Sequence, residues 1–219
     1  MVSRSRAAYV RSCAAAIVAV TTTQRPVSSS ATTSTTVVNS VLAAYGVPTI
    51  GDEGKFTSTY IELDDGGQRT ICAFAFPANW VEAKKRDGFM TAANYQSGDG
   101  LVFNVGAPQK AKAIGDVSAL SIVAESTPSD GVAKILREVS VTKGGVNYAY
   151  LTVQYNTVTR SGYDVERIAY IAATVRQRKL FSLVATTSSE RRNKMDVDLN
   201  AIRASFRVGD AGAVEGSVH

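Results

Sequence analysis

The sequence predicts an α+β sandwich, in which an amphipathic C-terminal helix covers a twisted antiparallel sheet. Three observations predict it. Strand-like segments follow one another through short turns in the second half of the chain, which is typical of antiparallel hairpins. Segments with helical spacing lie before and after them. The 219 residues, 45% hydrophobic and 20% charged, suffice for one globular domain and a tail.

The first strands are predicted in the region rich in β-branched and aromatic residues. They cover 56–63 and 71–76 and are joined by the turn-forming Asp64-Asp65-Gly66-Gly67. A third strand is predicted over 101–105, entered through Gly98-Asp99-Gly100. Cys72 lies inside the second apolar strand, where a buried and unreactive thiol is expected.

Two helices are predicted next. The first covers 117–125 and ends before Pro128; the second begins at Ser129 or Asp130, which would cap it, and extends to about residue 139. The helical spacing comes from Leu120, Val123 and Ala124 in the first, and from Val132, Ile135, Leu136 and Val139 in the second.

The centre of the chain predicts a β-hairpin. Residues 138–143 and 146–158 flank Gly144-Gly145, and glycine pairs adopt the positive φ angles of tight hairpin turns. In the second arm, alternate residues divide between two faces of the strand. One face carries Ala149, Leu151, Val153 and Tyr155, and the other carries Tyr148, Tyr150, Thr152 and Gln154.

Two more strands and a helix complete the domain. The strands are predicted over 167–175 and 180–187, joined by the charged turn 176–179. An amphipathic helix is predicted over 189–205. Its apolar residues, four, three and four positions apart, are Met195, Leu199, Ile202 and Phe206.

The first fifth of the chain differs in composition from the rest. Residues 1–43 hold eight Ser, seven Thr and four Arg with no acidic residue, whereas residues 44–219 are close to neutral. An Arg-rich, Ser-rich and acid-poor beginning is typical of an organelle transit peptide. Val41-Leu42-Ala43 places apolar or small residues before a candidate processing site at Ala44. A Ser/Thr-rich flexible segment with no targeting role is the alternative.

The common enzyme motifs are missing from the sequence. The only histidine is His219, so the chain offers no histidine for a Ser-His-Asp, Cys-His or HExxH centre within its body. Zinc-type Cys spacing, GxGxxG, GxxxxGK[ST] and GxSxG motifs do not occur either. The sequence therefore predicts a protein that is not an enzyme, with no small-molecule substrate.

Charged clusters supply the candidate binding residues. Glu62, Asp64 and Asp65 surround a Gly-Gly turn and could offer oxygens to calcium, although a solvated turn is the simpler interpretation. The basic runs 84–86, 176–179 and 191–194 could each dock on a partner or be solvated surface. They lack interleaved aromatic residues and a recognised nucleic-acid-binding motif, so nucleic acid is not an expected partner.

Several segments resemble one family. Phe74-Ala75-Phe76-Pro77-Ala78-Asn79-Trp80 is similar to an F-x-x-P-x-x-W-type segment of that family. The stretch 148–208 resembles it too, with a tyrosine-bearing strand, Arg167 leading the next strand, 179–183 as a third, and a helix ending Ser205-Phe206-Arg207-Val208. Ala44-Tyr45-Gly46 is similar to the family's mature start. The family is PsbP, the extrinsic lumenal protein of photosystem II, with its PsbP-like and PsbP-domain relatives.

The resemblance implies a non-catalytic protein of the plastid thylakoid lumen, peripheral to the membrane, with an α-β-α sandwich around a central antiparallel sheet. It implies binding to lumenal subunits of photosystem II, where PsbP supports water oxidation and the retention of calcium and chloride. Relatives instead act as photosystem I assembly factors or as subunits of the thylakoid NDH-like complex, and these alternatives remain open. No directly bound cofactor is expected apart from the calcium candidate above.

The resemblance divides the chain into a targeting or flexible segment (1–43), an N-terminal arm (44–55), a PsbP-like domain (56–208) and a flexible tail (209–219). Contacts with the partner are expected from the arm and two basic runs, specifically Ala44, Tyr45, Gly46, Lys84, Lys85, Arg86, Arg191, Arg192 and Lys194.

Three positions depart from the family pattern. Ile168 stands where members often carry histidine, Arg192 where a tryptophan is common, and 176–179 lacks the usual glycine. A metal site that uses that histidine does not carry over to this chain. Trp80, Pro77 and Phe206 are expected to be packing residues.

Overall fold

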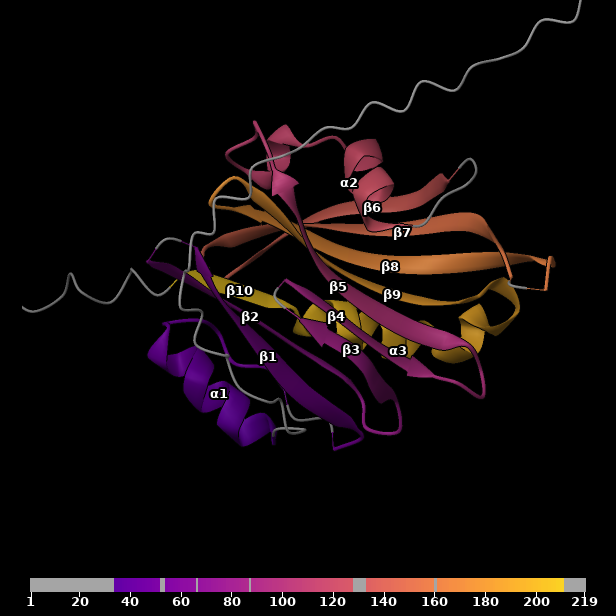
Figure 1. The fold of residues 1–219 in the computed structure, drawn as a ribbon, viewed down its shortest axis with the longest axis horizontal. Helices are drawn as coiled ribbons and strands as arrows, with labels where there is room; N and C mark the ends of the chain where they lie inside the picture. Colours follow the sequence, from indigo (N-terminus) through magenta and orange to yellow (C-terminus); the bar gives the residue numbers. More distant parts are fainter. Residues whose placement is uncertain are drawn as a thin grey trace, which may run out of the picture.

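The structure, a computed structural model, describes residues 34–210 apart from 52–53, 66, 87, 128–132 and 160, and it describes no side chain for residues 84, 85 and 108. Among these residues the strands form two antiparallel sheets (Figure 1). The small sheet has the order β1 (Phe56–Asp65), β2 (Gln68–Pro77), β10 (Arg207–Asp210). The large sheet has the order β3 (Val81–Arg86), β4 (Phe89–Asn94), β5 (Asp99–Pro108), β9 (Lys179–Ser188), β8 (Asp164–Arg176), β7 (Val146–Val158), β6 (Lys134–Lys143).

The main core lies between the two sheets and α3 (Arg192–Ser205), which follows the short 3-10 helix η2 (Ser189–Arg191). α3 packs on β2, β8 and β9 through the apolar residues that the sequence spacing predicted, and Phe206 at its C-terminal end is fully buried. Phe206 contacts the rings of Phe74, Phe103 and Tyr148, with centroids 5.9–6.5 Å away. The Val208 N–H donates to Tyr148 Oη over 3.0 Å, so the same tyrosine also fixes β10.

A second core covers the opposite face of the large sheet. There α2 (Ala119–Ser126) and the 3-10 helix η1 (Ile114–Asp116) pack on β7, β8 and β9. Helices therefore lie on both faces of the large sheet, which confirms the predicted α+β sandwich with the C-terminal helix on the sheet. The two predicted faces of β7 are also confirmed, because the set that begins at Ala149 lies in the second core, whereas Tyr148 and Tyr150 of the other set lie in the main core.

One predicted helix is wrong. The segment assigned from residue 129 to 139 contains the first half of β6, and residues 128–132 lie outside the described part. Ile135 and Val139 fit both helical and strand spacing, and pairing with β7 decides for the strand. In α2, which confirms the first predicted helix, Ile122 and Val123 are buried, but Leu120 is 67% exposed instead of lying on the buried face.

The β6–β7 hairpin is confirmed in its predicted register. Lys143 pairs with Val146 across Gly144-Gly145, whose φ angles of 54° and 75° require the freedom of glycine. The β8–β9 turn has the same left-handed geometry without glycine, at Gln177 and Arg178 (φ 48° and 58°). This explains how the turn is built although the family's usual glycine is missing.

A helix occupies the end of the segment that composition assigned to targeting. α1 (Thr35–Ala44) covers the outer face of the small sheet, with Val38 and Leu42 fully buried. The predicted boundary between residues 43 and 44 therefore falls inside a packed helix. Residues 1–33, and with them most of the transit-like segment and Cys13, lie outside the described residues, and processing stays a prediction. At the other end β10 continues to Asp210, two residues beyond the predicted domain.

The predicted arm lies against the small sheet and α1. The Ile50 N–H donates to Asn39 Oδ1 over 2.8 Å, and Asn39 Nδ2 donates to the Ile50 carbonyl over 2.9 Å. Val47 is buried against Gly209 of β10 so closely that a Cβ at Gly209 would overlap Val47 Cγ2. The arm therefore packs on the face of the small sheet at β10, toward which a side chain at Gly209 would point. None of the helices within the described residues is long and apolar enough to cross a membrane.

The close approach of the arm to β10 can be tested with Gly209→Ala. Because the added methyl group would overlap Val47, we expect a loss of about 1–3 kcal/mol in the free energy of unfolding, measured by urea denaturation. Gly115→Ala is the matched control, since a Cβ there meets nothing within 4 Å. In a Val47→Ala background the cost of Gly209→Ala should largely disappear. An equal cost in both backgrounds would contradict the contact.

Candidate functional site

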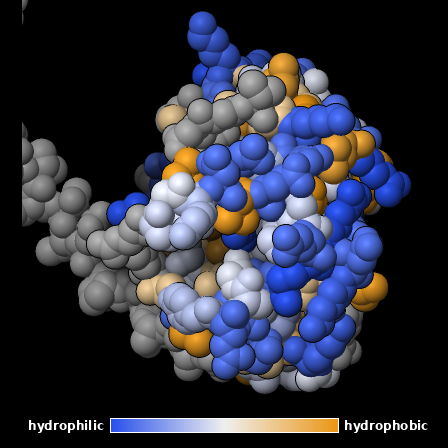
Figure 2. Space-filling view, turned by 90° about the vertical axis from the view of Figure 1, so that its right-hand side faces the viewer, coloured by the Kyte–Doolittle hydropathy of each residue, from blue (hydrophilic) through white to orange (hydrophobic). Residues whose placement is uncertain are grey.

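One end of the large sheet gathers two turns and the start of the C-terminal helix. β4, β7 and β9 end there, and β5 and β8 begin there, so the β4–β5 turn (95–98), the β7–β8 turn and η2 lie together. We call this region the turn end. It is the right-hand side of the ribbon in Figure 1 and faces the viewer in Figure 2.

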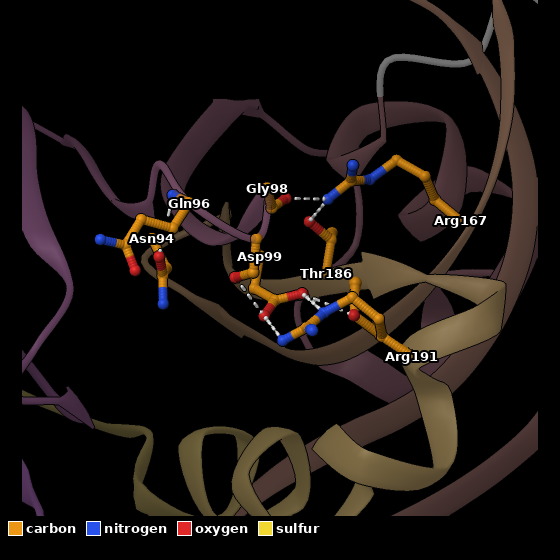
Figure 3. Close-up of polar contacts among 9 residues, drawn as sticks. Asn94, Gln96, Gly98, Asp99, Arg167, Thr186 and Arg191 are labelled. Atoms are coloured by element: carbon orange, nitrogen blue, oxygen red, sulfur yellow. Dashed lines mark hydrogen bonds and ion pairs between the residues drawn. The ribbon is translucent and has the colours of Figure 1, made fainter.

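Asp99 lies at the centre of the turn end and is only 1% exposed. Ser97 Oγ donates to its Oδ2 and Thr187 Oγ1 to its Oδ1, each over 2.6 Å. Arg191 donates two hydrogen bonds to the same carboxylate, from Nη2 to Oδ2 over 2.8 Å and from Nε to Oδ1 over 3.3 Å (Figure 3). Burial favours the neutral acid, but the hydrogen bonds from Arg191, Ser97 and Thr187 outweigh it and hold the pKa of Asp99 below its ordinary value of 3.8.

Arg167 of β8 fixes the same turn from the other side. Its Nη2 donates to the Gly98 carbonyl over 2.7 Å and to Thr186 Oγ1 over 3.0 Å (Figure 3). Within the turn, the Gln96 N–H donates to Asn94 Oδ1 over 3.0 Å. The β4–β5 turn is therefore held by β8, β9 and η2 at once, and its outer side chains project from a rigid base.

The surface of the turn end is polar with isolated hydrophobic residues (Figure 2). Tyr95 and Tyr163 stand out because each is 72% exposed, one beside each turn. Arg192 and Lys194, in the first turn of α3, are exposed as well. Exposed tyrosine and arginine on a rigid support are the residue types that protein interfaces favour. The arrangement can bind a protein surface.

The predicted partner-binding residues are not brought together. Arg192 and Lys194 lie at the turn end, whereas Arg191 is committed to Asp99. Arg86 ends β3 at the opposite end of the large sheet, with its guanidinium 5.0 Å from the centroid of Phe89. Lys84 and Lys85 precede it on this edge strand, and their side chains lie outside the description.

Ala44, Tyr45 and Gly46 lie in a third place, at the C-terminal end of α1. Tyr45 Oη donates to Glu62 Oε1 of β1 over 3.1 Å. Burial, and then this hydrogen bond, raise the pKa of Tyr45. The tyrosine of the predicted mature start therefore ties the end of α1 to the small sheet, while Ala44 is exposed.

The three carboxylates of the calcium candidate each have a protein partner. Glu62 accepts the Tyr45 hydroxyl, Asp64 accepts the Gly67 N–H over 2.9 Å, and Asp65 forms an ion pair with Lys179 over 2.6 Å. In the described part of the chain, no three His, Cys, Asp or Glu side chains form a group that could hold a metal ion. The arrangement of these residues fits a closed hairpin end better than a calcium loop.

Sequence reasoning missed two charged residues with central positions. Asp99 was noted only as part of a glycine motif, and nothing local to it indicates its partners Thr187 and Arg191, which are 88 and 92 positions away. Arg203 is a different case. It follows Ile202 and lies four residues after Leu199 on the apolar face of α3, and a charge in such a position is a signal of a buried polar contact. Arg203 is 9% exposed and lies between the rings of Tyr150 and Tyr170.

The Asp99 network predicts a pH-dependent stability. Asp99→Asn should lower the free energy of unfolding at neutral pH by about 2 kcal/mol, because hydrogen bonds to the charged carboxylate are lost. The folded pKa of Asp99 lies below 3.8, so its stabilising effect is present above that pH and is lost as pH falls through the folded pKa. The wild type should thus lose its advantage over the variant in acid. Chemical denaturation at neutral and acid pH measures this, with the exposed Asp164→Asn as control; a difference that does not change with pH would contradict it.

Comparison with known proteins adds the following. The PsbP family model matches residues 68–208. No curated protein sequence matches the chain. Among solved structures, the chain is similar to cyanobacterial PsbP (CyanoP) of Synechocystis sp. PCC 6803, at 16% identity and a TM-score of 0.46, covering 68% of this chain and 91% of that one.

Two further solved structures are also similar to the chain. They are the Ran-binding protein Mog1p of Saccharomyces cerevisiae (11% identity, TM-score 0.41, 68% and 87% covered) and LpqN of Mycobacterium tuberculosis, involved in cell envelope biogenesis (12%, 0.42, 69% and 91%). Likeness at this level carries no functional argument. The family match is different, because it extends from the first residue of β2 into β10 and takes in the large sheet and α3. On that match, the chain belongs to the PsbP family.

Proposed function

We propose that this chain is a non-catalytic extrinsic subunit of the thylakoid lumen that binds photosystem II. There it would stabilise the oxygen-evolving region and help to retain calcium and chloride. The observation that carries the proposal is the PsbP family match over residues 68–208. The departures at Ile168 and Arg192 leave this region folded as one sandwich, since Ile168 is buried in the main core and Arg192 is exposed on α3.

The turn end is the surface best suited to this docking. Asp99, Arg167 and Arg191 fix its turns before any partner arrives, so little conformational entropy remains to be lost on binding. Tyr95 and Tyr163 would supply buried contact area, and Arg192 and Lys194 would meet acidic groups. We propose further contacts from Lys84–Arg86 and from the exposed end of α1 at Ala44.

A covering protein of this kind needs no reactive group. It would act by excluding water and closing exit paths for ions over the surface that it covers. Exposed ion pairs at the rim are screened within about 8 Å at physiological salt, so the binding should be sensitive to salt. Rim charges would then set the rate and salt dependence of association, and the tyrosines would set most of its strength.

A second function has one observation in its favour. Where family members often carry histidine, this chain has Ile168, which is 2% exposed and packed in an apolar cluster. A changed residue at that position suits a relative that assembles photosystem I or belongs to the NDH-like complex. An assembly factor would be much less abundant than the reaction centre, whereas a subunit would match it.

Fractionation of thylakoids tests the proposal directly. Detergent-solubilised thylakoids from the organism that encodes the chain are separated under native conditions, and mass spectrometry follows the chain through the fractions. We expect near-stoichiometric migration with photosystem II that is lost after a high-salt wash. Trace amounts with photosystem I intermediates, or migration with an NDH-like complex, would overturn the proposal and establish the second function.

Charge reversal tests the turn end itself. Arg192→Glu with Lys194→Glu should release the protein from washed photosystem II membranes at a lower salt concentration than wild type, because two rim attractions become repulsions. Lys110→Glu with Lys112→Glu is the matched control, with the same charge change and spacing on the loop after β5. Equal release of the two double variants would show that docking uses another surface, and Lys84, Lys85 and Arg86 replaced together by Ala would be examined next.

A further inference from the structure

Three cations gather around one tyrosine on the α3 side of the large sheet, away from the turn end. Lys143 ends β6, Arg203 lies in the last turn of α3, and Arg207 begins β10. Lys143 Nζ lies 5.2 Å and the Arg203 guanidinium 4.9 Å from the ring centroid of Tyr150 on β7. Arg207 is close enough to act electrostatically on both Lys143 and Tyr150. We call Lys143, Tyr150, Arg203 and Arg207 the Tyr150 cluster.

The cations of the Tyr150 cluster donate to neutral oxygens. Lys143 Nζ and Arg207 Nη1 both donate to the Ala204 carbonyl, the latter over 2.7 Å, and Arg207 Nη2 reaches the Thr49 carbonyl over 3.2 Å. Arg203 donates to the Leu151 carbonyl, Thr152 Oγ1 and Asn200 Oδ1. None of the salt bridges among the described residues includes a member of this cluster.

Among the described residues, one carboxylate acts electrostatically on the cluster, and both of its oxygens already accept hydrogen bonds. Asp196 acts on Arg203, but its Oδ1 accepts the Tyr170 hydroxyl and its Oδ2 accepts Asn200 Nδ2 over 3.1 Å. Arg137 of β6 adds a further like charge near Arg203. Burial, and then the charges of Arg207 and Arg203, lower the pKa of Lys143 from 10.5 to about 8. The cluster therefore holds an excess of positive charge.

The C-terminus of α3 accounts for part of that charge. The carbonyl groups there carry about half a negative charge, and cations beside them stabilise the helix. Three cations exceed this half charge severalfold. Helix capping therefore explains the bonds to Ala204 but leaves most of the positive charge uncompensated.

Three polar atoms of the cluster also find no partner among the described residues. Tyr150 is 8% exposed, and its buried Oη makes no hydrogen bond to any of them; the same holds for Nε of Arg203 and Nε of Arg207. A buried donor without an acceptor costs free energy. Three unused donors among three cations define the missing group, which must accept hydrogen bonds and carry negative charge.

We propose that Lys143, Tyr150 and Arg207, with Arg203 behind them, form a binding site for one oxyanion of the carboxylate or phosphate type. The Tyr150 hydroxyl and the ammonium and guanidinium groups would donate to its oxygens, as charge-assisted hydrogen bonds require. Lys143 is half-buried, so the site opens to solvent at the corner where β6, α3, β10 and the arm meet. This inference does not rest on the proposed docking to photosystem II.

The test measures thermal unfolding of the full chain while sodium phosphate or sodium acetate replaces sodium chloride at constant ionic strength. We expect a saturable rise in Tm for wild type. Tyr150→Phe should bind phosphate about tenfold more weakly than wild type, and so should Lys143→Met, whereas the exposed Lys112→Met should bind as wild type does. Without oxyanion, Tyr150→Phe should be at least as stable as wild type, because the variant removes a buried hydroxyl that has no partner.

The outcomes separate the two sources of an oxyanion. Saturable binding of phosphate or acetate, weakened in both cluster variants, supports a free anion. Binding of a polyglutamate peptide alone, measured by calorimetry and weakened in the same variants, supports the same site with the carboxylate supplied by a partner's side chain. The proposal is overturned if neither probe binds beyond the chloride control, if both cluster variants bind like wild type, or if Tyr150→Phe destabilises the anion-free protein.

Discussion

The packing of Phe206 against Phe74, Phe103 and Tyr148 is the contact on which the rest of the structure depends. It joins the small sheet, the large sheet and the end of α3 at one buried point. Offset and tilted aromatic pairs at these separations stabilise beyond the area that they bury. Because Phe206 ends α3 and precedes β10, its position also decides where Arg203 and Arg207 lie and where β10 meets the arm.

The interior of this protein is filled by apolar side chains, and its two main polar clusters lie at the ends of the sheets. These two clusters differ in their charge balance. At the turn end, Asp99 is buried but paired with Arg191 and two hydroxyl groups, so the charges cancel and the network stabilises the turns. In the Tyr150 cluster, three cations meet neutral oxygens and an unpartnered hydroxyl. The first cluster is complete as part of the fold. The second is complete only with an acceptor from outside the described residues, which is why one supports a docking surface and the other a binding site.

The sequence allowed the hairpin, the faces of β7 and the apolar stripe of α3 to be predicted, because each depends on spacing within one segment. The separate small sheet, β3, β4 and β10 were not predicted. β3 is a charged edge strand and β10 has four residues, so neither carries an apolar pattern of its own. The segment before Val139 was assigned to a helix because its spacing is ambiguous until β7 pairs with it. Asp99 and Arg191 become partners only through the fold, across 92 positions.

A run of basic residues in the sequence does not show which of its charges are available to bind a partner. Arg191 and Arg192 are neighbours in one such run, yet Arg191 forms an ion pair with Asp99 while Arg192 is exposed. Lys179, in another run, is paired with Asp65. Arg203 and Arg207 belong to no run, yet they lie together in a cluster where none of the cations forms a salt bridge within the described residues. A charge in this protein is available for a partner only where the fold leaves it without a counter-charge. The surfaces that recognise other molecules therefore have to be read from the pairing of charges in three dimensions, and their order along the chain is a poor guide to them.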